Sequence, residues 1–219
     1  EKSFYSAIDY NYFATDFHIN MFFKNLFDDQ GPTMHFRAME KGKVIRTGWP
    51  MEYMAMTLLP FKDTPKRNLI LFPHRIAPEK QVEIFRDLAV QMPEYQFVVC
   101  QDSELSKDEY HKLLAESKIV FSCSLQETLG IGCYEGALLD AIPLVPDRLS
   151  YHEMYDAEFR YPSEWTKNWD SYLKYRNLLV EHIRYKMTGY PDKVGHIRYQ
   201  ARRLSDHFFS AGALLENLK

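Results

Sequence analysis

The chain has 219 residues, of which 46% are hydrophobic and 26% are charged, and its formal net charge is −3. These values are typical of a globular protein and exclude a disordered tail, a collagen-like rod and a coiled coil. They also argue against a nucleic-acid binder that works through a uniformly basic surface, although a local basic face stays open. The length allows one full domain plus a fragment, or one large domain.

The three cysteines, Cys100, Cys123 and Cys133, predict neither a disulfide framework nor a metal site. Two of them end apolar runs, which favours buried free thiols in a reducing, cytoplasmic compartment. No apolar stretch reaches the roughly 18 residues that span a membrane. The N-terminus has no signal-peptide pattern, so we expect no membrane span and a cytoplasmic location.

Residues 1–48 differ in pattern from the rest of the chain. Phe4–Tyr10 is an aromatic run typical of a short strand, and Lys43–Thr47 predicts another. Between them, apolar residues at a spacing of three and four predict a helix over Phe17–Phe27, capped by Thr15 or Asp16. We interpret this segment as separate from the domain that follows.

Residues 49–66 contain several prolines and predict a linker. From Asn68 onward, short apolar runs alternate with amphipathic helices, as in a parallel, Rossmann-like sheet with flanking helices. This α/β domain is expected over residues 67–165, and further helices over 166–219. The expected strands cover 69–72, 96–100, 119–122 and 143–145, and the helices cover 78–91, 106–117, 132–140, 169–186 and 191–209.

Ligands of open α/β sheets bind beyond the carboxyl ends of the strands. The first expected strand is followed there by His74, Arg75 and Lys80. Arginine and lysine can neutralise phosphate oxygens, so these cations are candidates for a diphosphate site. The alternative is a solvated loop with cations that bind nothing.

The third expected strand is followed by the segment 127–136, which carries Gly130 and Gly132 in a strand-to-helix turn. Glycines let the backbone approach a ligand closely, and the amide N–H groups of a helix start face anions. Glu127 and Glu135 could hold sugar hydroxyls at the two ends of one nucleotide sugar. The alternative is that Glu127 caps the helix and Glu135 lies on the surface.

This block resembles the donor-binding half of GT-B glycosyltransferases, and specifically the large retaining family four. The resemblance covers about residues 67–160 and rests on Arg75-Ile-Ala-Pro-Glu-Lys80, on two glutamates separated by seven residues, and on the proline-led strand Ala141-Ile-Pro-Leu-Val-Pro146. The stretch 143–153 looks like the queuosine-tRNA mannosyltransferase branch and related bacterial and phage enzymes. Leu129 replaces the usual aromatic residue, and Gly136 replaces the usual alanine.

The resemblance implies a role for each matching residue. Arg75 and Lys80 would neutralise the donor diphosphate and the charge that grows on it in the transition state. Glu127 would hold the donor sugar, and Glu135 would bind the ribose. The amides of Leu129, Gly130 and Ile131 would line the sugar and the phosphate. His74 is a further donor-binding candidate because of its place beside Arg75, and not because of the resemblance. The family generally needs no metal, so the nucleotide-diphosphate sugar is the only co-substrate expected.

The function expected from this resemblance is sugar transfer with retention of configuration. The alternatives are a non-catalytic nucleotide-sugar-binding module and an epimerase or phosphorylase of the same fold. The stretch 184–203 carries six cations and one acid, so a modified base in a nucleic acid is one candidate acceptor, beside a lipid-linked or free glycan. GT-B glycosyltransferases have two Rossmann-like domains, so the resemblance implies that residues 1–48 are the remnant of an N-terminal acceptor domain. The missing part of that domain would choose between these acceptors.

Overall fold

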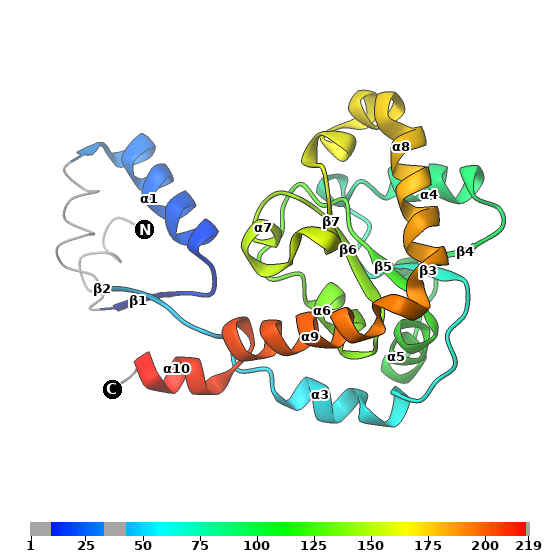
Figure 1. The fold of residues 1–219 in the computed structure, drawn as a ribbon. Helices are drawn as coiled ribbons and strands as arrows, with labels where there is room; N and C mark the ends of the chain where they lie inside the picture. The colour runs from blue at the N-terminus through cyan, green and yellow to red at the C-terminus, as the bar shows by residue number, and fades with distance from the viewer. Residues whose placement is uncertain (1–9, 33–42, 218–219) are drawn as a thin grey trace. The chain divides into compact units, whose positions relative to one another are not determined.

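The computed structural model describes residues 10–32 and 43–217, which fall into two compact units (Figure 1). The larger unit comprises Tyr53–Leu204, and the smaller comprises the N-terminal segment to Glu52 together with the chain from Ser205. No helix of the described part is both long enough and apolar enough to cross a bilayer.

The larger unit is built on a five-stranded, fully parallel sheet, which confirms the predicted α/β fold. Its spatial order is β4-β3-β5-β6-β7. Most strand residues are buried, and β3 and β6 are buried along their whole length, as in a sheet covered on both faces. The strands are β3 (Leu69–Phe72), β4 (Gln96–Val99), β5 (Ile119–Phe121), β6 (Ile142–Pro146) and the unpredicted β7 (Arg160–Tyr161).

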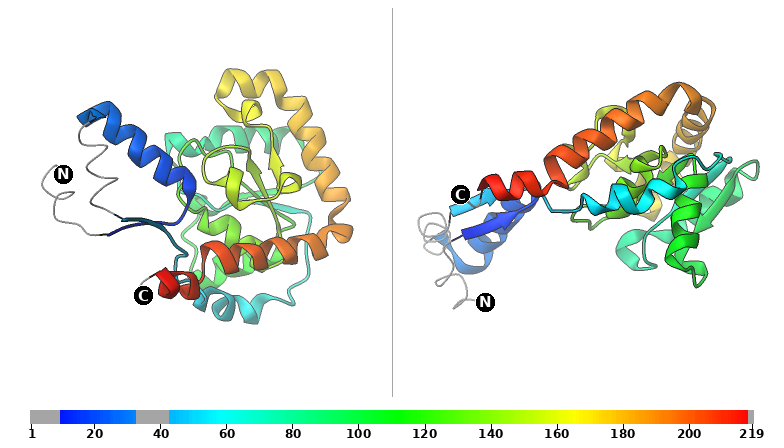
Figure 2. Two further views of the ribbon diagram at one scale, coloured as in Figure 1. Left: turned by 60° about the vertical axis from the view of Figure 1, so that its left-hand side comes forward. Right: turned by 90° about the horizontal axis from the view of Figure 1, so that it is seen from below.

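The side of the sheet on which successive strands are added changes after β4. From β3 it steps outward to β4, and it then returns to the other side of β3, where Ile70 pairs with Ile119 of β5. Right-handed crossovers therefore place the helix after β3 on one face and the next two helices on the other. These helices are α4 (Val82–Gln91), α5 (Lys107–Glu116) and α6 (Ile131–Leu138), and Figure 2 shows them from two further sides.

The long helix α8 (Trp169–Thr188) packs against α4, and α9 (Tyr190–Phe208) follows it. Asn168 caps α8 by accepting a hydrogen bond from the amide of Ser171, and Ser106 with Glu109 forms a reciprocal capping box on α5. A short helix α7 (Tyr151–Met154) lies between β6 and β7. Both helices therefore begin where the sequence predicted, at Ser106 and at Trp169, and a capping hydrogen bond fixes each start.

Two expected boundaries differ from the structure. The helix expected over 78–91 is a 3-10 turn (Pro78–Lys80) followed by α4, because Gln81 between them has a left-handed backbone with φ 54°. The expected linker 49–66 contains the helix α3 (Tyr53–Leu58) and a 3-10 turn (Leu59–Phe61). α3 buries Met54 and Leu58 and contacts α6, so it belongs to the larger unit.

The smaller unit contains two parallel strands, β1 (Tyr10–Phe13) and β2 (Lys43–Arg46), and the helices α1 (Asp16–Gln30) and α10 (Ala211–Asn217). Thr15 caps α1 by accepting a hydrogen bond from the amide of His18, as expected. The carbonyl of Phe208 accepts a hydrogen bond from the Trp49 amide at 2.7 Å, which joins the two segments of this unit. The strand expected over Phe4–Tyr10 lies outside the described residues except for its last residue.

Candidate functional site

The candidate site lies where the strand order reverses, between the carboxyl ends of β3 and β5. A crevice at such a switch point is where open α/β sheets bind ligands. Two loops meet there, residues 73–81 after β3 and residues 122–130 after β5. Leu125 N–H donates to the carbonyl of Glu79 at 2.7 Å, and the Gln81 side-chain amide donates to the carbonyl of Cys123 at 2.6 Å. The two loops are therefore fixed to each other.

Lys80 and Glu127 form a buried ion pair across these loops. Lys80 Nζ lies 2.9 Å from Glu127 Oε2 and donates to the carbonyl of Gln126 at 2.6 Å. Only 10% of the Lys80 side chain and 16% of the Glu127 side chain are exposed. Burial favours the neutral acid, but the hydrogen bond and charge of Lys80 outweigh it and hold the pKa of Glu127 below its usual value. Two of the three expected catalytic residues are thus in contact.

His74 lies beside this ion pair. Its Nδ1 atom is 3.8 Å from Glu127 Oε2, and its Nε2 atom is buried with no hydrogen-bond partner among the described residues. Burial lowers the pKa of His74 to about 4, although the nearby Glu127 carboxylate opposes this shift. The imidazole is therefore neutral at pH 7, and its Nε2 atom is buried with its hydrogen-bonding capacity unused by the described residues.

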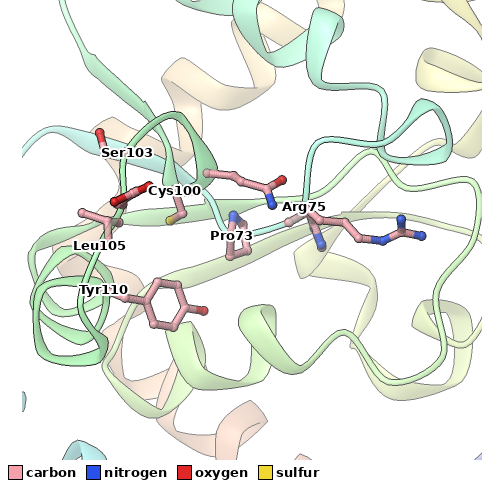
Figure 3. A pocket seen from close by; sticks show the side chains of 9 residues that line it. Pro73, Arg75, Cys100, Ser103, Leu105 and Tyr110 are labelled. Atoms are coloured by element: carbon pink, nitrogen blue, oxygen red, sulfur yellow. The ribbon is translucent and has the colours of Figure 1, made fainter.

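Arg75 is not brought together with these residues. Its side chain is 67% exposed, and its guanidinium group pairs with the carboxylate of Glu79, four residues later in the chain. Figure 3 shows the guanidinium group extending away from Cys100 and Tyr110. Its expected contact with a diphosphate therefore requires a different side-chain conformation and stays a prediction.

The start of α6 presents a tight backbone turn to the same crevice. Gly130 has φ 61°, and a Cβ atom there would lie 2.6 Å from Cε1 of Tyr151, so the position requires glycine in both respects. No described residue accepts a hydrogen bond from the amides of Leu129, Gly130 or Ile131. The side chain of Leu129 is buried, whereas that of Ile131 is exposed. These three amides have the free N–H groups expected of an anion site.

Glu135 lies one turn further along α6 and is buried rather than on the surface. Tyr110 of α5 donates a hydrogen bond of 2.8 Å from its hydroxyl group to Glu135 Oε2. Burial raises the pKa of Glu135, and the hydrogen bond from Tyr110 opposes that rise. Next to it, a Cβ atom on Gly136 would lie 2.4 Å from Cγ2 of Val120, which explains why alanine is absent at this position.

A cavity of about 360 Å³ opens beside these residues (Figure 3). It is wide open to solvent and lies at the carboxyl ends of β3 and β4. His74 and Arg75 line it, whereas Lys80, Glu127 and Glu135 do not. The lining residues are Pro73, His74, Arg75, Cys100, Gln101, Ser103, Glu104, Leu105 and Tyr110.

Three residues of this region lie outside the set of expected site residues: Tyr110, Gln81 and Arg148. The guanidinium group of Arg148 donates to the carbonyls of Cys123 and Ser124 at 2.8 Å and thereby holds the loop that carries Glu127. The only signal for Arg148 was its place directly behind β6, which an ordinary turn explained equally well. Tyr110 had no signal, because it lies within a helix and reaches the site only through the packing of α5 on α6.

No group of three or more His, Cys, Asp or Glu side chains in the described ranges is arranged to hold a metal ion. The three cysteines are free thiols, and burial raises the pKa of each of them.

No protein-family model matches the chain. Among solved structures, the chain is similar to the pneumococcal O-GlcNAc transferase GtfA in complex with UDP and GlcNAc, with 13% identity and a TM-score of 0.60 over 96% of this chain and 44% of that chain. It is also similar to Anabaena Alr3699/HepE in complex with UDP, with 14% identity and a TM-score of 0.53 over 86% of this chain and 61% of that chain. A structure of the GtfA/B complex matches with 12% identity and a TM-score of 0.58 over 96% of this chain and 45% of that chain.

These neighbours have the GT-B glycosyltransferase fold, and the parallel sheet with its flanking helices matches the Rossmann-like half of that fold. The expected fold class is thereby confirmed. The chain spans 44% of the length of GtfA and 61% of the length of HepE. At these identities the likeness shows the fold alone.

Proposed function

We propose that this chain is the donor-binding half of a glycosyltransferase that moves a sugar from a nucleotide-diphosphate sugar to an acceptor with retention of configuration. The observation that carries the proposal is the buried Lys80–Glu127 ion pair, which lies at the switch point beside the open amides of 129–131. Cation, carboxylate and free N–H groups are the set that a sugar diphosphate requires. UDP in complexes of the structural neighbours supports the same class of ligand.

Each group has a defined part in this proposal. Lys80 and the amides of Leu129, Gly130 and Ile131 stabilise the negative charge that grows on the diphosphate as the bond to the anomeric carbon breaks. Glu127 accepts hydrogen bonds from the sugar hydroxyls. The acceptor oxygen attacks from the face that the diphosphate leaves and forms the new bond there. Its proton passes to an oxygen of the departing phosphate, which keeps atoms and charges balanced.

A non-catalytic nucleotide-sugar-binding module is the main rival, and an epimerase or a phosphorylase of the same fold is the second. All three would bind a nucleoside diphosphate, so binding alone does not separate them. Release of free sugar from the donor by the complete protein favours a transferase over a binding module. Incorporation of inorganic phosphate into the sugar product would identify a phosphorylase.

The acceptor is a separate question, and the basic stretch 184–203 bears on it. Most of its cations already have partners within the larger unit. Arg184 pairs with Glu94 at 2.7 Å, and Arg198 pairs with Asp140 at 2.8 Å. A nucleic acid bound through this stretch would have to replace such ion pairs, so the structure weakens the argument for a polyanionic acceptor. A steep decrease of RNA binding with salt, flattened by neutralising Arg198, Arg202 and Arg203 together, would restore it.

The deciding experiment titrates UDP, GDP and their sugar conjugates against the 219-residue chain by calorimetry. We expect one of the two nucleoside diphosphates to bind. Glu127→Ala should lower the affinity for its sugar conjugate more than the affinity for the free diphosphate. Equal losses would place Glu127 away from the sugar. Failure of the folded chain to bind any of these ligands would overturn the proposed function.

A further inference from the structure

The hydroxyl group of Tyr110 and the carboxylate of Glu135 form a buried pair next to the cavity. The donor belongs to α5 and the acceptor to α6, and the hydrogen bond between them measures 2.8 Å. It occupies Glu135 Oε2, while Oε1 receives no hydrogen bond from a described residue. One oxygen is therefore held by the protein, and the other is left for a ligand.

Tyr110 is also the principal group that opposes the effect of burial on the pKa of this carboxyl. Burial raises the pKa of Glu135, the Tyr110 hydrogen bond lowers it, and the charge of Lys107 lowers it by less. Cys100 and Cys133 are the other titratable groups near the pair, and burial keeps both thiols protonated at neutral pH. Removal of the phenol would therefore leave Glu135 easier to protonate and free to rotate.

The position of the phenol is itself fixed by packing. A Cβ atom on Gly132 would lie 3.3 Å from the Tyr110 oxygen and 2.8 Å from Cβ of Pro73. Because Gly132 has no side chain, Tyr110 and Pro73 can both lie close to the backbone of α6. Tyr110 and Pro73 also line the cavity (Figure 3), so the side chain of Tyr110 borders an open space next to Glu135.

We propose that Tyr110 is a positioning residue: its hydrogen bond to Oε2 fixes the orientation of the Glu135 carboxylate and leaves Oε1 for the ribose of the donor, so the phenol sets how strongly the site prefers ribonucleotides to 2′-deoxyribonucleotides. This inference rests on the proposed function and on ribose binding by Glu135, which the family resemblance implies, and what it adds is the role of Tyr110. A carboxylate that accepts one hydrogen bond from the 2′-hydroxyl should favour UDP over 2′-deoxy-UDP by about 10- to 100-fold.

The test measures the dissociation constants of UDP and 2′-deoxy-UDP for the 219-residue chain and for Tyr110→Phe. We expect the variant to reduce the preference for UDP to about threefold or less, mainly by lowering the affinity for UDP. In the wild-type chain, UDP affinity should fall as Glu135 is protonated at low pH. In Tyr110→Phe this fall should begin at a higher pH, because the opposing hydrogen bond is gone. A purely structural role would move neither the ratio nor the pH profile.

Glu135→Gln and the double variant test whether Tyr110 acts through Glu135. Glu135→Gln should reduce the preference on its own and abolish its pH dependence. Addition of Tyr110→Phe to Glu135→Gln should change the ratio no further. The matched control is Tyr199→Phe, which removes a phenol from an exposed position on α9 and should leave both affinities unchanged.

Three results would overturn the inference: an equal loss of affinity for both nucleotides in Tyr110→Phe, an unchanged ratio, or additive effects in the double variant. Equal binding of UDP and 2′-deoxy-UDP by the wild-type chain would overturn it while leaving the proposed function intact. If the folded chain binds no nucleoside diphosphate, the proposed function itself fails, and the inference fails with it.

Discussion

Lys80 and Glu127 neutralise each other in a place that excludes most water, so each depends on the other for stability as well as for ligand binding. We predict that Lys80→Met destabilises the fold by about 3–5 kcal/mol, because it leaves the carboxylate buried without its partner. The double variant Lys80→Met/Glu127→Gln should recover part of this loss. Urea unfolding at pH 7 measures both, and a loss below about 1 kcal/mol in the single variant would contradict the burial of the pair.

The same pair carries a pH dependence whose sign follows from Glu127. The pKa of this carboxyl is lower in the folded chain than its usual value of 4.5. Its contribution to the free energy of unfolding is therefore present above pH 4.5 and is lost as the pH falls through the folded-state pKa. Lys80→Met should remove this contribution, so the variant should lose less stability than the wild-type chain upon acidification through that window.

His74 makes a second residue-level prediction, on stability against pH. Burial lowers its pKa from 6.5 to about 4, so the unfolded chain binds a proton between these values and the folded chain does not. The contribution of His74 to the free energy of unfolding is therefore present above pH 6.5 and is lost as the pH falls toward 4. Between pH 7 and pH 5 the free energy of unfolding should decrease by about 2 kcal/mol less in His74→Asn than in the wild-type chain. Because burial also lowers the pKa of His182, only the difference between variant and wild type reports on His74.

The control for that measurement is His207→Asn, at an exposed position of α9, which should leave the pH dependence of unfolding as it is. An identical decrease in His74→Asn and in the wild-type chain would mean that the His74 ring is hydrated in solution.

At the scale of elements, the packing of α6 on β5 depends on a missing side chain. The Cβ atom of an alanine at 136 would lie 2.4 Å from Cγ2 of Val120, which is a short, branched group that cannot swing away. Gly136→Ala should therefore cost about 1–3 kcal/mol. Val120→Ala introduced with it should cost less than the sum of the two single changes. Thermal unfolding of the three variants tests the contact.

Gly195→Ala is the matched control for this prediction. Gly195 lies within α9, and a Cβ atom there would meet nothing within 4 Å. Because alanine is the better helix former, this variant should gain about 0.5–1 kcal/mol. A similar loss in both variants would show that helix propensity, and not the close approach to Val120, controls the effect.

The elements that the sequence predicted are those whose signals are local. The capping box of Ser106 with Glu109 lies within four residues, and the buried strands appear as short apolar runs. The break at Gln81 could not be predicted, because its left-handed backbone accompanies hydrogen bonds to carbonyls 42 and 85 residues away. β7 was missed because a two-residue strand has no recognisable periodicity.

The candidate site follows the same rule. Lys80 and Glu127 could be placed together because strand order alone brings the ends of β3 and β5 to one edge. Arg75 could not be oriented from sequence, since a neighbouring Glu79 competes for its guanidinium group. Tyr110 reaches Glu135 only through the contact of two helices, and such a contact depends on packing rather than on spacing along the chain.

At the scale of the whole molecule, every residue assigned to the donor site belongs to the larger unit, Tyr53–Leu204. This unit holds the complete five-stranded sheet, the helices that cover it and the cavity. The chain segments to Glu52 and from Ser205 contribute none of these residues. Donor binding and the smaller unit should therefore be separable by truncation at the two places where the chain passes between the units.

We predict that residues 53–204 fold on their own and bind UDP with a dissociation constant within about threefold of that of the whole chain, a difference of roughly 0.7 kcal/mol. The physical reason is that the hydrogen bonds that hold Glu127 and Glu135, from Lys80 and Tyr110, all lie inside this segment. Cooperative thermal unfolding checks the fold and calorimetry checks the affinity, with Lys80→Met in the same segment as a variant that should weaken UDP. A folded segment that binds UDP more than tenfold more weakly than the whole chain would show that the smaller unit supplies part of the donor site.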